Sequence, residues 1–196
     1  MKREELNGKT FAEVQELLEQ ESVLFQEELK GVNEVEEVMS KENDLIEEMK
    51  EYDKYLDTVS YNLEDSIEYD LHKYTKNEIA AKIVYFLNKT EVEWQYTLGM
   101  YELVKLWKNR DLKTIKYKEY DSTLRCLNLV KFKGYQEWQD ILAINEYLSA
   151  CHEAYTIDTA YLYAMSDKHN AIMNRVKELD PESIPDQPMA VEPQCI

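Results

Sequence analysis

Apolar residues recur at intervals of three, four and seven along most of the chain, which is the spacing of one face of an α-helix. Residues 135–179 contain neither proline nor glycine and predict one long C-terminal helix, with a break near Asp158 or Ser166 as an alternative. The other predicted helices cover residues 10–30, 34–72, 76–88 and 91–109. The pattern therefore predicts an all-α fold, an elongated bundle of long, coiled-coil-like helices.

The segment 34–72 has the most regular pattern, because its apolar residues recur every seven positions in two adjacent rows. These rows are Val38, Leu45, Tyr52 and Val59, and Met49, Leu56 and Leu63. Glu42 interrupts the seam near its start. Apolar and polar residues also alternate from 58 to 71, so a β-hairpin stays open there as an alternative.

Residues 113–133 carry two patterns. Ile115 and Tyr117 alternate with lysines, as in a strand, whereas residues 124–130 have helical spacing. We favour helix for this segment, with a small β-hairpin within 113–133 as the alternative.

Helix starts are indicated by Ser, Thr or Asn followed three residues later by Glu, because these side chains satisfy free backbone N–H groups reciprocally. Four such capping boxes are predicted, at Thr10/Glu13, Asn33/Glu36, Thr75/Glu78 and Thr90/Glu93. Gly31 is expected to end the first helix in the left-handed conformation that glycine adopts easily.

Glycine and proline are scarce, with 4 of each in 196 residues, and every proline follows residue 180. This scarcity argues against a turn-rich β-sandwich and against a glycine-rich phosphate loop. We therefore expect one helical domain over 1–179 and an extended, acidic, Pro-rich tail over 180–196. Met189, Val191 and Ile196 are the apolar anchors through which this tail is expected to dock on a partner.

The formal net charge of −17 is distributed unevenly. Residues 1–75 form an acidic arm with 22 acids and 8 bases, residues 76–134 are basic with 7 and 12, and residues 135–196 are acidic with 11 and 3. The predicted partner-binding residues of the basic middle are Lys105, Lys108, Arg110, Lys113, Lys116 and Lys118.

Trp107 and Tyr117 interleave with these bases, a composition that also occurs in nucleic-acid contacts. We do not expect nucleic acid as the partner, because a net charge of −17 repels polyanions. Pairing with the acidic arm, or with an acidic surface of a neighbouring copy, is the favoured interpretation.

Catalytic and metal-binding patterns are lacking in the sequence. The histidines His72, His152 and His169 have no glutamate three residues before them, and no zinc-protease or nucleophile-elbow motif occurs. We therefore predict no enzyme activity, no metal site and no cofactor. His169 and Asp158 stand in otherwise apolar rows, where we interpret them as hydrogen-bonded polar residues that set helix register.

The three cysteines are odd in number and widely spaced, which favours a reducing compartment. The N-terminus has no apolar signal-peptide core, and no apolar run is long enough to cross a bilayer. The expected location is the cytoplasm or an intracellularly assembled particle, without secretion and without a membrane partner.

These features together predict a non-enzymatic structural or assembly component, such as a scaffold, an adaptor or a virion-type subunit. Its expected partners are other protein subunits, in a homo- or hetero-oligomer. One alternative is an acidic inhibitor that mimics nucleic acid and occupies a basic groove of its target. A more remote alternative is a carboxylate–metal enzyme built on a helical bundle.

Overall fold

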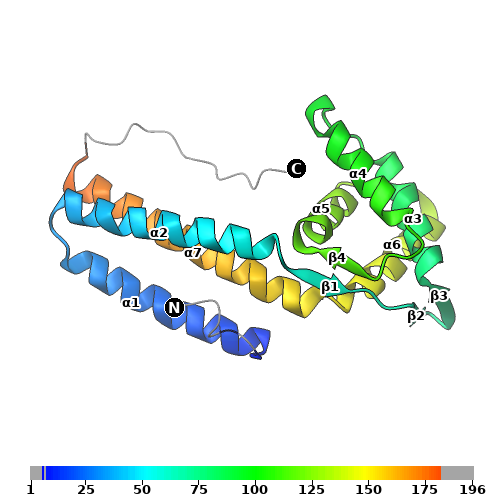
Figure 1. Cartoon of the computed structure of the whole chain (residues 1–196), viewed down its shortest axis with the longest axis horizontal. Helices are drawn as coiled ribbons and strands as arrows, with labels where there is room; N and C mark the ends of the chain where they lie inside the picture. The colour runs from blue at the N-terminus through cyan, green and yellow to red at the C-terminus, as the bar shows by residue number, and fades with distance from the viewer. Residues whose placement is uncertain (1–5, 7, 182–196) are drawn as a thin grey trace. The chain divides into compact units, whose positions relative to one another are not determined.

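The computed structural model describes residue 6 and residues 8–181. The described residues are mostly helical, with seven α-helices and two small antiparallel sheets, which confirms the predominantly helical prediction (Figure 1). They separate into two compact units, although the sequence analysis predicts a single domain over 1–179. Unit 1 contains the described residues up to Leu56 and those from Glu153 onward, and unit 2 contains Asp57–His152.

Unit 1 consists of α1 (Phe11–Gly31), α2 (Val35–Leu56) and nearly all of α7 (His152–Leu179), which lie side by side (Figure 1). The capping box at the start of α1 is confirmed, because the Thr10 N–H donates to Glu13 Oε2 at 2.8 Å and the Glu13 N–H donates to Thr10 Oγ1 at 3.4 Å.

The α1–α2 connection differs from its prediction. Gly31 stays within α1 and the extended Val32 follows as the C-cap, so the predicted left-handed glycine is wrong. Helix α2 begins at Val35, and Asn33 donates its side-chain amide to the Gly31 carbonyl instead of capping α2.

Polar contacts join α2 to α7, which runs antiparallel to it. The Tyr52 hydroxyl donates to the Asp158 carbonyl oxygen at 3.1 Å, and the Tyr161 hydroxyl donates to Glu48 Oε1 at 2.6 Å. Glu42 Oε1 lies 2.6 Å from His169 Nδ1. Asp158 is buried and His169 is mostly covered. Both are hydrogen-bonded, as the sequence interpretation expected.

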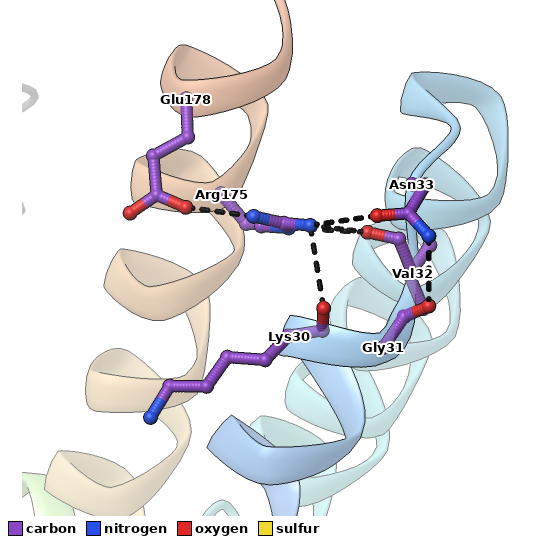
Figure 2. A network of polar contacts seen from close by, with 6 residues as sticks. All are labelled: Lys30, Gly31, Val32, Asn33, Arg175 and Glu178. Atoms are coloured by element: carbon purple, nitrogen blue, oxygen red, sulfur yellow. Dashed lines mark hydrogen bonds and ion pairs between the residues drawn. The ribbon is translucent and has the colours of Figure 1, made fainter.

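Arg175 of α7 joins the C-terminal end of α1 to its own helix (Figure 2). Its Nη2 donates to the Val32 carbonyl at 2.7 Å and to Asn33 Oδ1 at 3.3 Å. Its Nη1 donates to Glu178 Oε2 at 2.9 Å, and its Nη2 makes a longer bond of 3.4 Å to the Lys30 carbonyl. The guanidinium thus satisfies carbonyl groups that the end of a helix leaves without partners.

Unit 2 contains both sheets. Strand β1 (Ser60–Asn62) pairs antiparallel with β4 (Thr114–Lys116), which places the buried Tyr61 opposite the buried Ile115. Strands β2 (Ser66–Tyr69) and β3 (His72–Thr75) form a hairpin whose two turn residues, Asp70 and Leu71, have φ angles of 47° and 61°. Two left-handed central residues give the turn a twist that matches that of the strands.

These strands overturn part of the helical prediction. The helix over 34–72 is wrong beyond Leu56. The alternative for 58–71 is right that strands form there but wrong in their pairing, because β1 pairs with β4 and the hairpin joins residues 66–69 to residues 72–75. The first half of the seam is buried, including Val38, Leu45, Tyr52 and Leu56. Its later members, Val59 and Leu63, lie in unit 2 outside any helix, on either side of β1.

The segment 113–133 is neither entirely helical nor a local β-hairpin. Residues 114–116 form β4, which pairs with the distant β1, so the local hairpin is wrong. Helix α5 (Tyr117–Asn128) follows immediately, so the predicted helix is correct for residues 117–128 and wrong for 129–133.

The remaining helices of unit 2 are α3 (Lys76–Lys89), α4 (Thr97–Trp107) and α6 (Gly134–Ser149), with a 3₁₀ turn, η2 (Trp94–Tyr96), before α4. The Thr75/Glu78 capping box is confirmed. The Thr90/Glu93 box is wrong, because Thr90 is the C-cap of α3 and its hydroxyl donates to the Phe86 carbonyl. The helix predicted over 91–109 consequently starts later, at Thr97.

The single helix predicted over 135–179 is wrong, because α6 ends at Ser149 and α7 begins at His152. The buried Cys151 lies at this break, where its thiol donates to the Asn62 carbonyl at 3.3 Å. A long-range contact thus fixes the break, whereas Asp158 and Ser166 lie inside α7.

The core of unit 2 is rich in aromatic side chains that bond to backbone or to threonine. The Tyr120 hydroxyl donates to the Leu148 carbonyl at 2.8 Å, and the Tyr147 hydroxyl donates to the Glu64 carbonyl at 2.8 Å. Burial raises the pKa of both phenols.

An ion-pair cluster links α3 to the start of α6. Glu137 accepts hydrogen bonds from Lys89 Nζ at 2.6 Å, the Tyr85 hydroxyl at 2.8 Å and the Lys133 N–H at 2.6 Å. These bonds lower the pKa of Glu137 to about 2, with Lys89 the largest cause. Glu137 therefore stays ionised down to strongly acidic pH.

Candidate protein-binding groove

Helix α4 is apolar on two sides. Its inner side contributes Leu103, Val104 and Trp107 to the core of unit 2. Leu98 and Tyr101 are 73% and 62% exposed. Single exposed apolar side chains are ordinary on protein surfaces, so these two matter only through the hollow beside which they lie.

Helix α5 faces α4 and is held by polar contacts of the core. The Trp107 indole N–H donates to Thr123 Oγ1 at 3.0 Å, and the Thr123 hydroxyl donates to the Glu119 carbonyl at 2.7 Å. These bonds fix the spacing of the two helices at one level. Two cavities are lined by residues of both helices.

The larger cavity has a volume of about 710 Å³ and is lined mainly by apolar surface. It is lined by Leu98, Gly99, Glu102, Leu103, Lys105, Leu106, Asn109, Lys118, Glu119 and Ser122. Its volume falls in the range of small-molecule and peptide sites, and its wide opening to solvent suits an extended occupant.

A second cavity of about 290 Å³ continues it toward the start of α4. Its lining residues are Glu91, Val92, Glu93, Tyr96, Met100, Leu103, Ser122, Arg125, Cys126 and Leu129. Leu103 and Ser122 line both cavities. The two cavities are therefore adjacent along α4 and α5, and we call them together the α4–α5 groove. Leu129, 64% exposed, lies at its far end.

Two of the predicted partner-binding residues line this groove. Lys105 lies 3.6 Å from Glu102 on the same helix, and Lys118 lies 2.9 Å from Asp57. The Lys118–Asp57 pair joins the basic middle to the acidic arm within unit 2, as one of the sequence hypotheses expected.

The other four bases lie close to one end of the groove. Lys108 caps α4, Arg110 and Lys113 belong to the loop that follows, and Lys116 ends β4. All four are exposed, and none of them forms an ion pair with another residue of the described chain. We call residues 108–116 the basic loop. Asn109 of this loop lines the larger cavity, so the loop borders the groove directly.

The two aromatic residues that interleave with these bases are not on the surface. Trp107 is 2% exposed and Tyr117 is 7% exposed. Nucleic-acid surfaces that combine bases with aromatic rings need those rings free for stacking, and here both rings are core residues.

Met189, Val191 and Ile196 lie outside the described residues, as does the predicted extended tail beyond residue 181. Sequence reasoning missed the apolar members of the groove, among them Leu98, Met100 and Leu129. Their periodicity signals a helix face, but only the packing of α4 on α5 shows which face lies open.

Reactive groups are sparse in the described part of the chain. It contains no group of three or more His, Cys, Asp or Glu side chains arranged to hold a metal ion. Neither Cys126 nor Cys151 is in a disulfide, and burial raises the pKa of Cys151. Among the described helices, none combines the length and the apolar character that a bilayer crossing requires.

Comparison of the chain with protein-family models, with curated proteins and with solved structures gives no match.

Proposed function

We propose that this protein is a non-enzymatic assembly component whose copies associate through the α4–α5 groove. The observation that carries the proposal is the adjacency of the two cavities, which share Leu103 and Ser122 in their lining. Together they offer an apolar trough along α4, open to solvent and bordered at one end by exposed cations. Such a trough fits an extended segment of another polypeptide better than a compact small molecule.

The surroundings of the groove support a protein partner. An apolar trough gains free energy when a partner excludes water from it, at roughly 25 cal/mol per Å² of apolar surface buried. The charges at its rim then select the partner, because an acidic segment pairs with the basic loop whereas a basic one is repelled. A partner segment that is both apolar and acidic therefore fits best.

The lack of a disulfide at Cys126 and Cys151 supports the proposed location, the cytoplasm or an intracellularly assembled particle. The long α2 and α7 helices would give such a component its coiled-coil-like surfaces for further contacts.

Light scattering on the intact protein, over a micromolar concentration series, tests the proposal. We expect wild type to self-associate and the Leu98→Glu variant to associate about tenfold more weakly or not at all. A carboxylate placed in the mouth of an apolar trough loses hydration when the partner docks, and tenfold corresponds to only about 1.4 kcal/mol. Leu98 is mostly exposed, so the substitution leaves the fold intact.

The matched control is Leu24→Glu, because Leu24 is also a helical leucine, 66% exposed, but belongs to α1. It makes the same change of charge and should associate like wild type. A monomeric wild type across the series, or equal association of the Leu98→Glu variant, would overturn the proposal.

A further inference from the structure

We infer that a second copy of this chain inserts Phe132 into the smaller cavity of the α4–α5 groove, while its Lys131 and Lys133 pair with Glu91 and Glu93 beside that cavity. The inference rests on the proposed function, and it names the segment of the second copy that the groove receives. Both surfaces belong to unit 2, so the contact does not depend on how the two units are placed.

The smaller cavity has the size and the lining of a pocket for one aromatic ring. Its volume is about 290 Å³, and apolar side chains, among them Val92, Met100 and Leu103, make up most of its wall. A cavity of about 150 Å³ with an apolar lining already accepts benzene. The smaller cavity is also more enclosed than the larger one, so a ring that enters it is largely removed from water.

The charged groups that line the smaller cavity favour a cation. Glu91 and Glu93 are exposed, and neither forms an ion pair with a described residue. Glu93 accepts a hydrogen bond only from a neutral amide, that of Gln95, at 3.0 Å. The third charged group, Arg125, already donates to Asp121 at 2.7 Å. Two carboxylates thus await a positively charged partner.

The two ends of the groove therefore differ in charge. Glu91 and Glu93 precede α4, whereas the basic loop follows it. An acidic group suits the end beside the basic loop, and a basic group suits the smaller cavity. The segment that fills the smaller cavity must combine an apolar side chain with cations.

This chain itself exposes such a segment. Phe132 is 50% exposed and stands between Lys131 and Lys133, which are exposed and form no ion pair with a described residue. Among the exposed large apolar residues of the described chain, Phe132 alone has a lysine on each side. Composition thus selects this segment over the other exposed apolar positions.

The spacing of the two surfaces also matches. Residues 91–93 and 131–133 both lie outside helices and strands. Placed side by side in opposite directions, they set Val92 opposite Phe132 and each glutamate opposite a lysine. Val92 lines the smaller cavity, so this alignment brings the Phe132 ring to its mouth.

The ring and the cavity of one copy are close neighbours, which suits a two-fold dimer. Leu129 lines the smaller cavity, and Phe132 follows it by three residues without lining that cavity itself. Two copies related by a two-fold axis can therefore exchange their Phe132 side chains, and each contact then occurs twice. The exposed rings of Tyr135 and Trp138, 5.9 Å apart, extend the apolar surface of the same segment.

Charge reversal on each side of the contact tests the inference in the full-length chain. The rim variant carries Glu91→Lys and Glu93→Lys, and the lysine variant carries Lys131→Glu and Lys133→Glu. Each variant alone should associate at least about tenfold more weakly than wild type, because like charges then meet at both contacts. All four positions are exposed, so circular dichroism should show an unchanged fold.

A mixture of the two variants gives the most specific measurement. The lysines of the rim variant then meet the glutamates of the lysine variant, and the reciprocal contact has wild-type charges. We expect mixed dimers with an affinity close to that of wild type, detected by light scattering and by native mass spectrometry with one variant isotope-labelled. A chain that carries all four reversals should likewise associate with itself.

The Phe132→Ser variant tests the apolar part of the contact. It leaves the cavity of the second copy unfilled and should weaken association at least about tenfold. Its control is Tyr163→Ser, because Tyr163 is 66% exposed but belongs to α7. The control for charge reversal is Glu34→Lys/Glu36→Lys, two exposed glutamates with the same spacing at the start of α2. Both controls should associate like wild type.

Two results would overturn the inference. One is a mixture of the two variants that does not recover association, and the other is unchanged association of Phe132→Ser. If either occurs while Leu98→Glu still abolishes association, the groove is an assembly site with a different occupant. If wild type is monomeric over the whole concentration series, the proposed function fails as well.

Discussion

Unit 1 and unit 2 are held together by different kinds of interaction. Three polar or charged residues are buried in the described chain, and the two acidic ones, Glu42 and Asp158, lie between the helices of unit 1. Unit 2 has Thr123 alone. In contrast, the largest completely buried side chains, including Trp107, Tyr120 and Tyr147, lie mainly in unit 2.

This difference has an energetic meaning. Burial of large aromatic side chains supplies stability in proportion to the area that leaves water. A buried carboxylate costs free energy and is tolerated only with a partner, but its need for that partner disfavours other registers of the helices. Unit 2 therefore derives its stability from its aromatic core. In unit 1, the buried carboxylates lower the stability but define the alignment of α2 and α7.

The largest effect is expected from Trp107→Ala in unit 2. The substitution removes a ring that is 2% exposed, together with the hydrogen bond to Thr123, and should lower the free energy of unfolding by about 3–5 kcal/mol. Urea denaturation followed by circular dichroism measures the change. The control is Tyr101→Ala on the same helix, 62% exposed, which should change stability by less than about 0.5 kcal/mol. Similar losses for both variants would contradict an apolar origin of stability.

A smaller effect, and of a different kind, is expected from His169→Leu in unit 1. It leaves Glu42 buried without the imidazole that lies 2.6 Å away, and the Oε2 atom of Glu42 has no hydrogen-bond partner in the described structure. We expect a loss of about 2–3 kcal/mol in the free energy of unfolding.

The double variant Glu42→Leu/His169→Leu separates charge burial from loss of packing. Because it removes the carboxylate as well, it should regain most of the stability that the single variant loses. Denaturation of the single and double variants under the same conditions gives the comparison. A double variant less stable than His169→Leu would show that the pair contributes net stability rather than alignment.

Local signals in the sequence predicted the helix starts at Thr10 and Thr75 correctly, because a capping box depends on residues three apart. Burial of Asp158 with a hydrogen bond was also predictable, since it interrupts an apolar row. The errors in the predicted helices arose where a contact with a residue distant in the sequence decides the local structure. Residues 60–62 became a strand through pairing with 114–116, and the helix break at Cys151 coincides with its bond to Asn62.

Only the basic residues of the candidate site were predictable from the sequence, and its apolar lining was not. The bases from Lys105 to Lys118 are visible as a run in the sequence, and the structure places two of them in the groove and four beside it. The apolar half depends on how α4 packs against α5, which leaves the two cavities that share Leu103 and Ser122 in their lining. A helical period shows that a face is apolar, but it does not show whether another helix covers that face.

The smallest effect is expected at the rim of unit 1, from Arg175→Lys. The guanidinium bonds the Val32 carbonyl through two nitrogens, at 3.1 and 2.7 Å, and reaches Asn33 as well (Figure 2). A lysine ammonium keeps the charge but not the planar fork, so we expect a loss of about 1 kcal/mol. Hydrogen exchange should accelerate at the amides of the last turn of α1, before any change in α2. The control is the reverse exchange Lys177→Arg on the exposed side of α7, which should alter neither stability nor exchange. If Arg175→Lys also leaves the exchange rates of the α1 amides unchanged, the positive charge alone holds the end of α1 against α7. The planar geometry of the guanidinium then contributes nothing to the alignment of the helices in unit 1.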